Sequence, residues 1–202
     1  MSSEDEARVR IFRKLLAKVG RRMLIRASVD NPFANLLAHG LGAEWEGGFL
    51  LGTRDLSRKL AVDVPTGVKL RRFRKGDEKH MSRIHLAAFK FPFSPRLFFK
   101  WATSPNCRTT MAVSGERIVG FLTAEKRRYQ KYGDFNIALD PEYHRQGIGS
   151  SLVEKGLNDL AEMGCKTAMA DFLLQNAKVQ ALNRKYGFKI VRAYNYFRLN
   201  GS

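Results

Sequence analysis

The sequence predicts an α/β or α+β architecture in which helices pack in layers against a single sheet. From residue 68 onward, runs rich in β-branched and aromatic residues alternate with runs that have helical periodicity. The chain has 202 residues, of which 44% are hydrophobic and 27% are charged. This is enough for one sizeable core and marginal for two independent domains. We therefore expect one main domain over residues 67–202, preceded by an extension over residues 1–66.

Local signals place the elements of the main domain. Ser94 is a favoured N-cap and Pro95 fits a first helical turn, while Ser114-Gly115-Glu116 has the composition of a hairpin turn. Gly164 stands where a left-handed cap would end the longest helix. In chain order we expect a strand at 68–73, helices at 77–89 and 95–101, strands at 109–113, 117–126 and 135–139, a helix at 148–163, a strand at 167–172, a helix at 177–186 and a strand at 188–199.

The extension begins with a basic amphipathic pattern over residues 8–26. Its apolar residues recur at steps of three and four, which predicts one helix: Val9, Phe12, Leu16, Val19 and Met23. Its basic residues are Arg8, Arg10, Arg13, Lys14, Lys18, Arg21, Arg22 and Arg26. Two interpretations fit this pattern. The helix either lays its apolar stripe on the main domain or meets an anionic surface such as acidic lipid.

The rest of the extension lacks periodicity. Asp30-Asn31-Pro32 and a series of glycines interrupt residues 30–66, so we expect irregular or weakly structured chain there. Pro65-Thr66-Gly67 marks the boundary to the main domain. We find no internal repeat in the sequence.

The charge balance favours an anionic partner. Lysine and arginine number 36 against 19 aspartates and glutamates, which gives a net charge of +17. A phosphorylated cofactor, a nucleic acid or an acidic membrane surface would each suit this excess.

The cysteines and the N-terminus indicate the compartment. Cys107 and Cys165 are too few for a disulfide framework, and with four histidines they do not complete a metal site. The start Met-Ser-Ser-Glu-Asp-Glu is acidic where a secretory signal is basic, and no apolar run approaches the roughly 20 residues of a membrane span. We expect a cytoplasmic chain with no metal and no transmembrane segment.

The most informative segment is residues 137–150, where a predicted strand runs through a turn into a predicted helix. Gly147 and Gly149 would let the backbone approach a ligand, and the free N–H groups of a first helical turn bind anions. A dinucleotide-binding fingerprint would need a third glycine where the chain has Leu152, and the Gly-Lys-Ser/Thr of a Walker loop is absent. The segment therefore predicts a pyrophosphate site of another kind.

Residues His144-Arg145-Gln146-Gly147-Ile148-Gly149 resemble the acetyl-CoA-binding motif of the GNAT superfamily of N-acetyltransferases, Arg/Gln-x-x-Gly-x-Gly/Ala. His144 departs from this pattern. The resemblance extends from about Val68 to Leu199, with Tyr186-Gly187-Phe188 similar to a Gly-Phe signature near its end. It implies a GNAT-like α+β fold, layered α/β/α, with a mixed, mostly antiparallel sheet flanked by helices behind an N-terminal helical extension.

Within the superfamily, the chain is most similar to bacterial enzymes that acetylate the N-terminal amine of a ribosomal protein. The residues that show this similarity are Ala88-Phe89, Phe91-Pro92-Phe93-Ser94, the run from Phe135 to Tyr143, and Asn176 eleven residues before Gly187. The resemblance implies that the backbone of Ile137, Ala138 and Leu139 pairs with the pantetheine amides of acetyl-CoA. It further implies that Asn176 contacts the cofactor, and that its pyrophosphate is held by His144, Arg145, Gln146, Gly147, Ile148, Gly149 and Ser150.

The implied reaction is that of an acyltransferase: an amine attacks the thioester of acetyl-CoA and a thiolate leaves. Where the similar enzymes place a glutamate as base, this chain has Asp171, and where they place a tyrosine as acid, it has Asn183. We take Asp171 as the candidate base, directly or through water, and Tyr186 or Tyr194 as the candidate acid. An aspartate at a strand end is also a common cap or ion-pair partner, and Tyr186 lies on the apolar face of its helix, which is typical of a core residue.

Several alternatives stay open. A CoA-binding module without catalysis would explain Asn183, and a basic adaptor for membrane or nucleic acid would explain the charge. The acceptor could be a protein N-terminus or a small-molecule amine. One cluster fits either an acceptor groove or a core beneath a loop: Phe89, Phe91, Phe93, Phe98, Phe99 and Trp101. For the isolated His85 we expect solvation or a local hydrogen bond.

Overall fold

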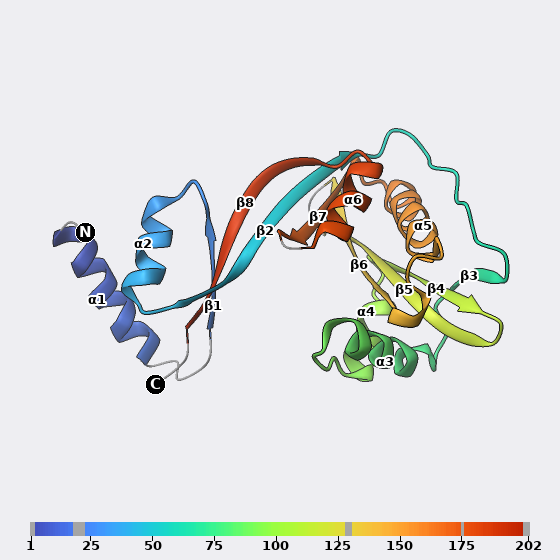
Figure 1. Ribbon diagram of the computed structural model, residues 1–202, viewed down its shortest axis with the longest axis horizontal. Helices are drawn as coiled ribbons and strands as arrows, with labels where there is room; N and C mark the ends of the chain where they lie inside the picture. The colour runs from blue at the N-terminus through green and yellow to red at the C-terminus, as the bar shows by residue number, and fades with distance from the viewer. Residues whose placement is uncertain (1–2, 18–22, 128–130, 175, 200–202) are drawn as a thin grey trace. The chain divides into compact units, whose positions relative to one another are not determined.

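The computed structural model describes residues 3–17, 23–127, 131–174 and 176–199 (Figure 1). These form two compact units. One comprises Arg54–Ala170, and the other combines the chain up to Thr53 with the chain from Asp171 onward.

The unit Arg54–Ala170 is a sheet with helices on it. Its strand order is β7-β6-β5-β4-β3; β3 to β6 pair antiparallel, and β6 pairs with β7 in parallel. Its elements are β3 (Val68–Arg72), α3 (Asp77–Phe89), α4 (Pro95–Ala102), β4 (Cys107–Ser114), β5 (Arg117–Lys126), β6 (Tyr132–Leu139), the 3-10 turn η1 (Pro141–Tyr143), α5 (Ile148–Glu162) and the first part of β7 (Thr167–Leu173). Each element expected here from the sequence is confirmed, with ends that shift by a few residues.

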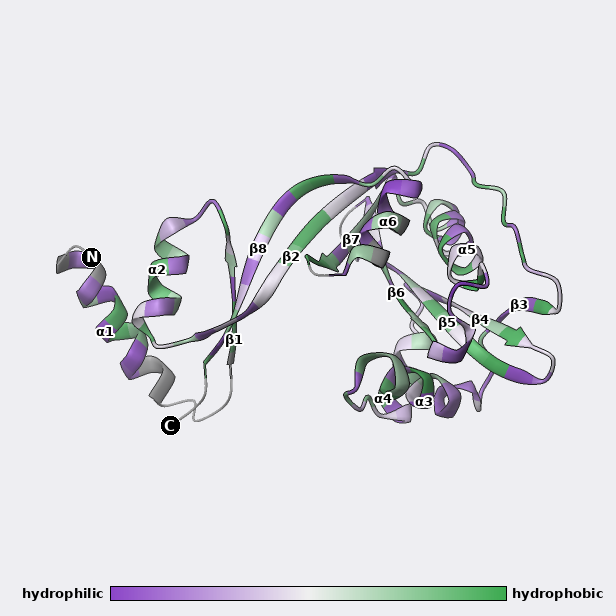
Figure 2. Ribbon diagram, in the orientation of Figure 1, coloured by the Kyte–Doolittle hydropathy of each residue, from purple (hydrophilic) through white to green (hydrophobic). Residues whose placement is uncertain are grey.

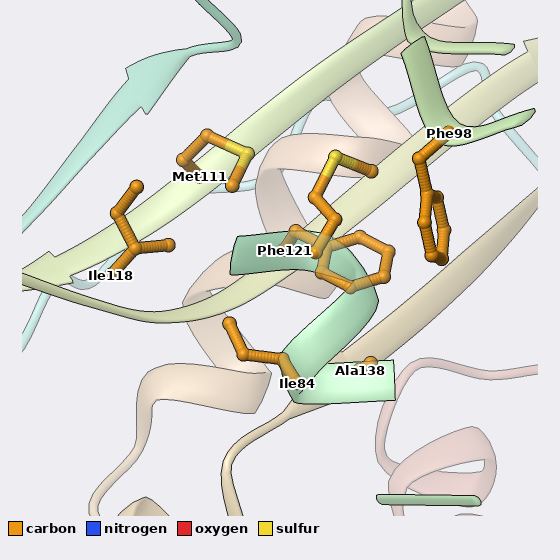
Figure 3. Packing of buried hydrophobic residues seen from close by; sticks show 7 residues of the cluster. Ile84, Phe98, Met111, Ile118, Phe121 and Ala138 are labelled. Atoms are coloured by element: carbon orange, nitrogen blue, oxygen red, sulfur yellow. The ribbon is translucent and has the colours of Figure 1, made fainter. Parts of the chain in front are cut away.

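The local signals act as predicted. The Ser94 side chain accepts the amide of Leu97 at the start of α4, and Gly164 has the left-handed φ of 80° just beyond α5. Helices α3 and α4 supply one side of a core whose members come from both layers: Met81, Ile84, Phe98, Met111, Ile118, Phe121 and Ala138 (Figure 3). Burying such side chains contributes roughly 1.5–3 kcal/mol each.

The second unit contains α1 (Ser3–Ala17), β1 (Met23–Ser28), α2 (Pro32–Gly40), most of β2 (Glu44–Asp55), the end of β7, α6 (Ala177–Lys185) and β8 (Lys189–Leu199). Strand β8 lies between β1 and β2 and is antiparallel to both. It contains both hydrophilic and hydrophobic stretches (Figure 2), and its buried side chain is that of Phe197. Phe197 packs against Ala27, Ala38 and Ala43.

Two expectations for the extension are wrong. The predicted helix at 8–26 ends at Ala17, and Met23 and Arg26 lie in β1, because β8 pairs with that segment and overrides its helical spacing. Val19 falls outside the described residues. Most of residues 32–55 form α2 and β2 instead of irregular chain, because Asn31 caps α2 by accepting the amide of Ala34 and β8 pairs with β2. Residues 56–67, all of which the structure describes, contain no helix or strand, and this part of the expectation is confirmed.

One succession of helices and strands occurs twice along the chain, although the sequence shows no internal repeat. The order α1-β1-α2-β2 recurs as α5-β7-α6-β8; α1 and α5 both have 15 residues, and α2 and α6 both have 9. Just after α2, the Gly42 amide donates a hydrogen bond to the His39 carbonyl. Just after α6, the Gly187 amide donates the equivalent hydrogen bond to the Arg184 carbonyl. Gly42 and Gly187 are 145 positions apart and have left-handed φ values of 74° and 71°. The two segments share structure with little sequence identity.

Candidate active site

Strands β6 and β7 are paired over only the first part of β6 and then separate. They pair only where Tyr132–Asp134 of β6 meet Thr167–Met169 of β7. Strand β6 continues to Leu139, paired on its other side with β5. Over residues 135–139, its second edge therefore has no β7 partner in the described part of the chain. Such an edge presents backbone N–H and C=O groups to an extended ligand that carries amides.

The residues predicted for pantetheine lie on this edge. Ile137, Ala138 and Leu139 are the last three residues of β6, and the Ala138 side chain is buried, so only its backbone faces a ligand. Within the described residues, the buried Oδ1 of the adjacent Asn136 has no hydrogen-bond partner. A buried amide oxygen without a partner costs free energy, so a ligand N–H would be favourable there.

The predicted pyrophosphate turn follows β6 directly. Arg145 and Gly147 both have left-handed φ values, 63° and 81°, and α5 begins at Ile148. Alternating conformations of this kind turn successive N–H groups toward one point and make an anion-binding concavity. The left-handed form costs about 1 kcal/mol at a residue with a Cβ, so Arg145 is strained at the position where a ligand is expected.

The first turn of α5 is open above Gly149. A Cβ built on Gly149 would meet no atom within 4 Å, so packing inside the protein does not require glycine here. The side chain of Ile148 is fully buried and that of Ser150 is half-buried. The residues therefore fit a diphosphate held mainly by backbone N–H groups at a helix start.

The other two predicted residues lie on the turn but have local contacts. The His144 Nε2 is 3.3 Å from the Leu139 carbonyl oxygen, and the Gln146 Nε2 donates to the Glu142 carbonyl at 3.3 Å. Both side chains are exposed. They brace the turn between β6 and α5.

A buried carboxylate anchors the same turn from below. Asp140 is 4% exposed, and its Oδ2 accepts hydrogen bonds from Arg83 at 2.9 Å and Arg117 at 3.0 Å. Burial alone would raise the pKa of Asp140, but the hydrogen bond from Arg83 and the Arg117 charge outweigh it and hold that pKa below its usual value. This cluster is not evident from the sequence, because its members are far apart in the chain.

An extended strap, residues 60–65, lies along α5 and ends at the turn. The Asn158 side chain accepts a hydrogen bond from the Leu60 N–H and donates one to the Leu60 carbonyl, both at 2.9 Å. Glu154 accepts a hydrogen bond from the Asp63 amide at 3.0 Å. A Cβ on Gly147 would stand 3.2 Å from the Pro65 ring. Because the strap covers and bonds Asn158 and Glu154, these polar side chains of α5 are buried rather than solvated.

The candidate base stands among charged and aromatic groups of the second unit. Asp171 is exposed near the end of β7, and its Oδ1 lies 3.2 Å from the Arg26 Nη2 of β1. The Arg26 guanidinium is 3.7 Å from the ring centroid of Tyr194 and 5.7 Å from that of Tyr196. The structure thus brings together two predicted residues, Asp171 and Tyr194, and adds Arg26, which sequence reasoning placed in a helix.

The remaining candidates have other surroundings. Tyr186 is 6% exposed with Lys185 over its ring at 5.1 Å, as expected of a core residue. Asn183 is 7% exposed, and its Nδ2 has no partner among the described residues. Asn176 accepts the Gln180 amide through its carbonyl at the start of α6.

The aromatic cluster divides between core and surface. Phe98 is buried, whereas Phe89, Phe91 and Phe99 are exposed. His85 is buried among these rings, with its Nδ1 3.2 Å from the Phe91 carbonyl oxygen, so the expected local hydrogen bond is confirmed. The described ranges contain no group of metal-ligating side chains and no helix long and apolar enough to span a membrane.

Comparison with known proteins identifies the family of this chain. The model of the acetyltransferase (GNAT) family matches residues 79–188, which contain β6, the turn and α5. The [ribosomal protein bS18]-alanine N-acetyltransferase of Escherichia coli (strain K12) is 41% identical over 54 residues, which cover 27% of this chain and 36% of that protein. The protein of the same name from Salmonella typhimurium is 29% identical over 116 residues, 52% of this chain and 70% of its own length. The chain thus matches only about a third of the Escherichia coli relative's length.

The fold is also found among solved structures. A GCN5-related N-acetyltransferase from Sphaerobacter thermophilus superposes with a TM-score of 0.73 at 15% identity, over 90% of this chain and 61% of that one. At this identity the likeness shows a common fold.

Proposed function

Because the chain belongs to the acetyltransferase (GNAT) family, we propose that it transfers an acetyl group from acetyl-CoA to a primary amine. The acceptor would be a protein N-terminus or a small-molecule amine. The observation that supports this most is the parting of β6 from β7 beside a turn that opens α5. Together they offer an unpaired strand edge for amides and a cluster of N–H groups for a diphosphate.

The residues of the turn would bind and orient the acetyl donor. The backbone of Ile137–Leu139 would hold the amide-bearing arm, and residues 144–150 would hold the diphosphate. The buried side-chain oxygen of Asn136 would accept a hydrogen bond from an N–H of acetyl-CoA. Acetyl-CoA, when bound, would supply the acetyl group as a thioester.

Asp171 would take the proton from the acceptor amine, directly or through one water, as the nitrogen attacks the thioester carbonyl. The N–C bond forms, the C–S bond breaks, and the leaving thiolate needs a proton. Tyr194 is better placed to supply it than Tyr186, because Tyr186 is buried whereas Tyr194 lies within the Arg26–Asp171 group. Asn183 cannot supply a proton to a thiolate.

The test is release of free CoA thiol when the protein is mixed with acetyl-CoA and a panel of amines. The panel holds a peptide with a free N-terminus, an Nα-blocked peptide with one lysine, a polyamine and an amino sugar. We expect acetylation of at least one amine, confirmed by its mass, and loss of turnover without loss of acetyl-CoA binding in Asp171→Asn.

The buried Asn183 favours one second candidate, a module that binds CoA and does not catalyse. Saturable acetyl-CoA binding with no turnover on any amine would support that candidate and contradict the proposal. Binding of nucleic acid or anionic vesicles that falls steeply with added salt, without acetyl-CoA binding, would instead support a basic adaptor.

A further inference from the structure

We propose that residues 3–55 are a second copy of the segment 148–199, and that Arg26 of this copy recognises the carbonyl or carboxylate group next to the acceptor amine. The proposal rests on the proposed function and specifies its acceptor. The amine would belong to an α-amino acid or to the N-terminus of a peptide. Lysine side chains and polyamines would be poor acceptors.

Two contacts join equivalent positions of the copies. Arg26 and Asp171 are 145 positions apart, the spacing of the repeat, and their side chains meet at 3.2 Å. Phe49 and Tyr194 have the same spacing and are direct partners in the β2–β8 ladder. Self-contacts between equivalent positions are what a local two-fold relation produces. In the three strands β1-β8-β2, the β8 of one copy lies between the two strands of the other.

The first copy has not kept a phosphate site. The first turn of α1 carries Glu4 where the first turn of α5 carries Gly149, and Glu6 follows two residues later. Carboxylates at these positions would repel a diphosphate. Its contribution to the site must therefore come from other residues, and the side chain of Arg26 contacts two candidate catalytic groups, Asp171 and Tyr194.

The Arg26–Asp171 pair is accessible and fixed in place. The side chains are 37% and 45% exposed, and the rings of Tyr194 and Tyr196 lie next to the guanidinium. The Phe49 ring packs on Tyr196 with centroids 4.3 Å apart. A guanidinium has five N–H donors in a planar fork, so Arg26 keeps donors for a ligand after it has bonded Asp171.

The paired charges match an α-amine and its neighbour. Asp171 would accept from the amine, and Arg26 would donate to the carbonyl oxygen, which lies three bonds from the amine nitrogen. An α-amino acid or peptide N-terminus has an amine and a carbonyl oxygen at this short spacing. A lysine side chain offers only methylene groups beside its amine, and a polyamine offers a second cation, which Arg26 would repel.

The experiment compares Arg26→Ala and Arg26→Lys with Arg198→Ala as the matched control. Arg198 also makes an exposed ion pair in this unit, with Glu46, and touches no candidate site residue. For each protein kcat/KM is measured with an alanine-headed peptide and with the same peptide Nα-acetylated and carrying one lysine. Binding of the alanine-headed peptide to the CoA-loaded protein is measured in parallel.

We expect wild type to prefer the free N-terminus by tenfold or more. Arg26→Ala should lower kcat/KM for it about 10- to 100-fold through KM, the effect of one charge-assisted hydrogen bond, and leave the KM for acetyl-CoA unchanged. Arg26→Lys should recover part of the loss, and Arg198→Ala should match wild type.

Preference of wild type for the lysine peptide, or an Arg26→Ala protein equal to wild type, would overturn the inference. If no amine is acetylated, the proposed function fails on its own. The binding arm then still decides the inference: peptide affinity that depends on Arg26 supports it, and affinity that does not depend on Arg26 overturns it. Thermal unfolding of each variant shows whether it is folded.

Discussion

The Asp140 carboxylate accepts a hydrogen bond from the Arg83 guanidinium at 2.9 Å, across 57 positions of the chain. Asp140 directly follows β6, and Arg83 lies on α3, so the pair ties the start of the turn to the helical layer. The geometry of the turn before α5 therefore depends on a contact that is not itself part of the ligand site.

Replacing Asp140 by Asn should weaken acetyl-CoA binding roughly tenfold and lower stability by about 1–3 kcal/mol, because two guanidinium groups lose their shared anion. Titration and chemical unfolding measure the two effects. Glu142→Gln is the matched control, since Glu142 is 68% exposed and pairs with the same Arg117. Equal effects of the two substitutions would contradict the anchoring role of Asp140.

Asp159 pins α5 to β3. It is fully buried and accepts from both terminal nitrogens of Arg72, at 2.5 and 2.6 Å. Asp159→Ala should cost about 3 kcal/mol of unfolding free energy, because it leaves a partly buried guanidinium without its anion. Glu162→Ala, which removes an exposed partner of Arg108, should cost under about 1 kcal/mol.

The same pair has a pH signature. Burial would raise the pKa of Asp159, but the hydrogen bonds from Arg72 and Lys155 outweigh it and place that pKa below the usual value. A depressed folded-state pKa means that the stabilisation is present above about pH 4 and is lost as the pH falls. Acid unfolding of Asp159→Asn should therefore be less steep than that of wild type.

His85 should make the fold sensitive to mild acid. Desolvation lowers the pKa of His85 below the usual value of 6.5, although the Phe91 carbonyl opposes this. The unfolded chain then binds a proton at a higher pH than the folded chain, so stability should fall as the pH drops below about 6.5. Urea unfolding between pH 7.5 and 5.5 should show a larger loss in wild type than in His85→Gln. Identical pH dependence in the two proteins would refute this.

Both thiols should react slowly in the folded protein. Desolvation raises the pKa of Cys107 to about 11, with a further rise from the Glu125 carboxylate, and Cys165 is buried. Alkylation with iodoacetamide at pH 8, monitored by mass spectrometry, should label little protein until a denaturant is added. Rapid labelling of the native protein would show that the Cys107 site is open.

Much of the unit Arg54–Ala170 was predictable, because its signals are local. Ser94-Pro95 at a helix start and Gly164 at a helix end determine their own surroundings. Asn31-Pro32 is a signal of the same kind as Ser94-Pro95, yet the glycines that follow it made this segment look irregular.

The remaining features depend on partners that are remote in sequence. Arg26 has the spacing of a helical residue and becomes a strand residue only because β8 pairs with it. The repeat was hidden because the two copies share lengths and cap bonds rather than residues. Within the site, the turn at 145–149 could be predicted from its glycines. The contacts of Asp140 with Arg83 and of Asn158 with the strap join residues far apart in the chain and could be seen only in the structure.

Gly149 provides the most direct measurement of the central claim. Acetyl-CoA is titrated calorimetrically into wild type, Gly149→Ala and Gly149→Glu, with thermal unfolding to confirm that all three are folded. Because a Cβ here meets no protein atom within 4 Å, and alanine or glutamate suits a first helical turn better than glycine, both variants should be at least as stable as wild type. Wild type and Gly149→Ala should bind at one site, and Gly149→Glu should bind about 100-fold more weakly or not at all, because its carboxylate faces the diphosphate. No binding by wild type, or equal binding by Gly149→Glu, would contradict the claim that this turn holds coenzyme A.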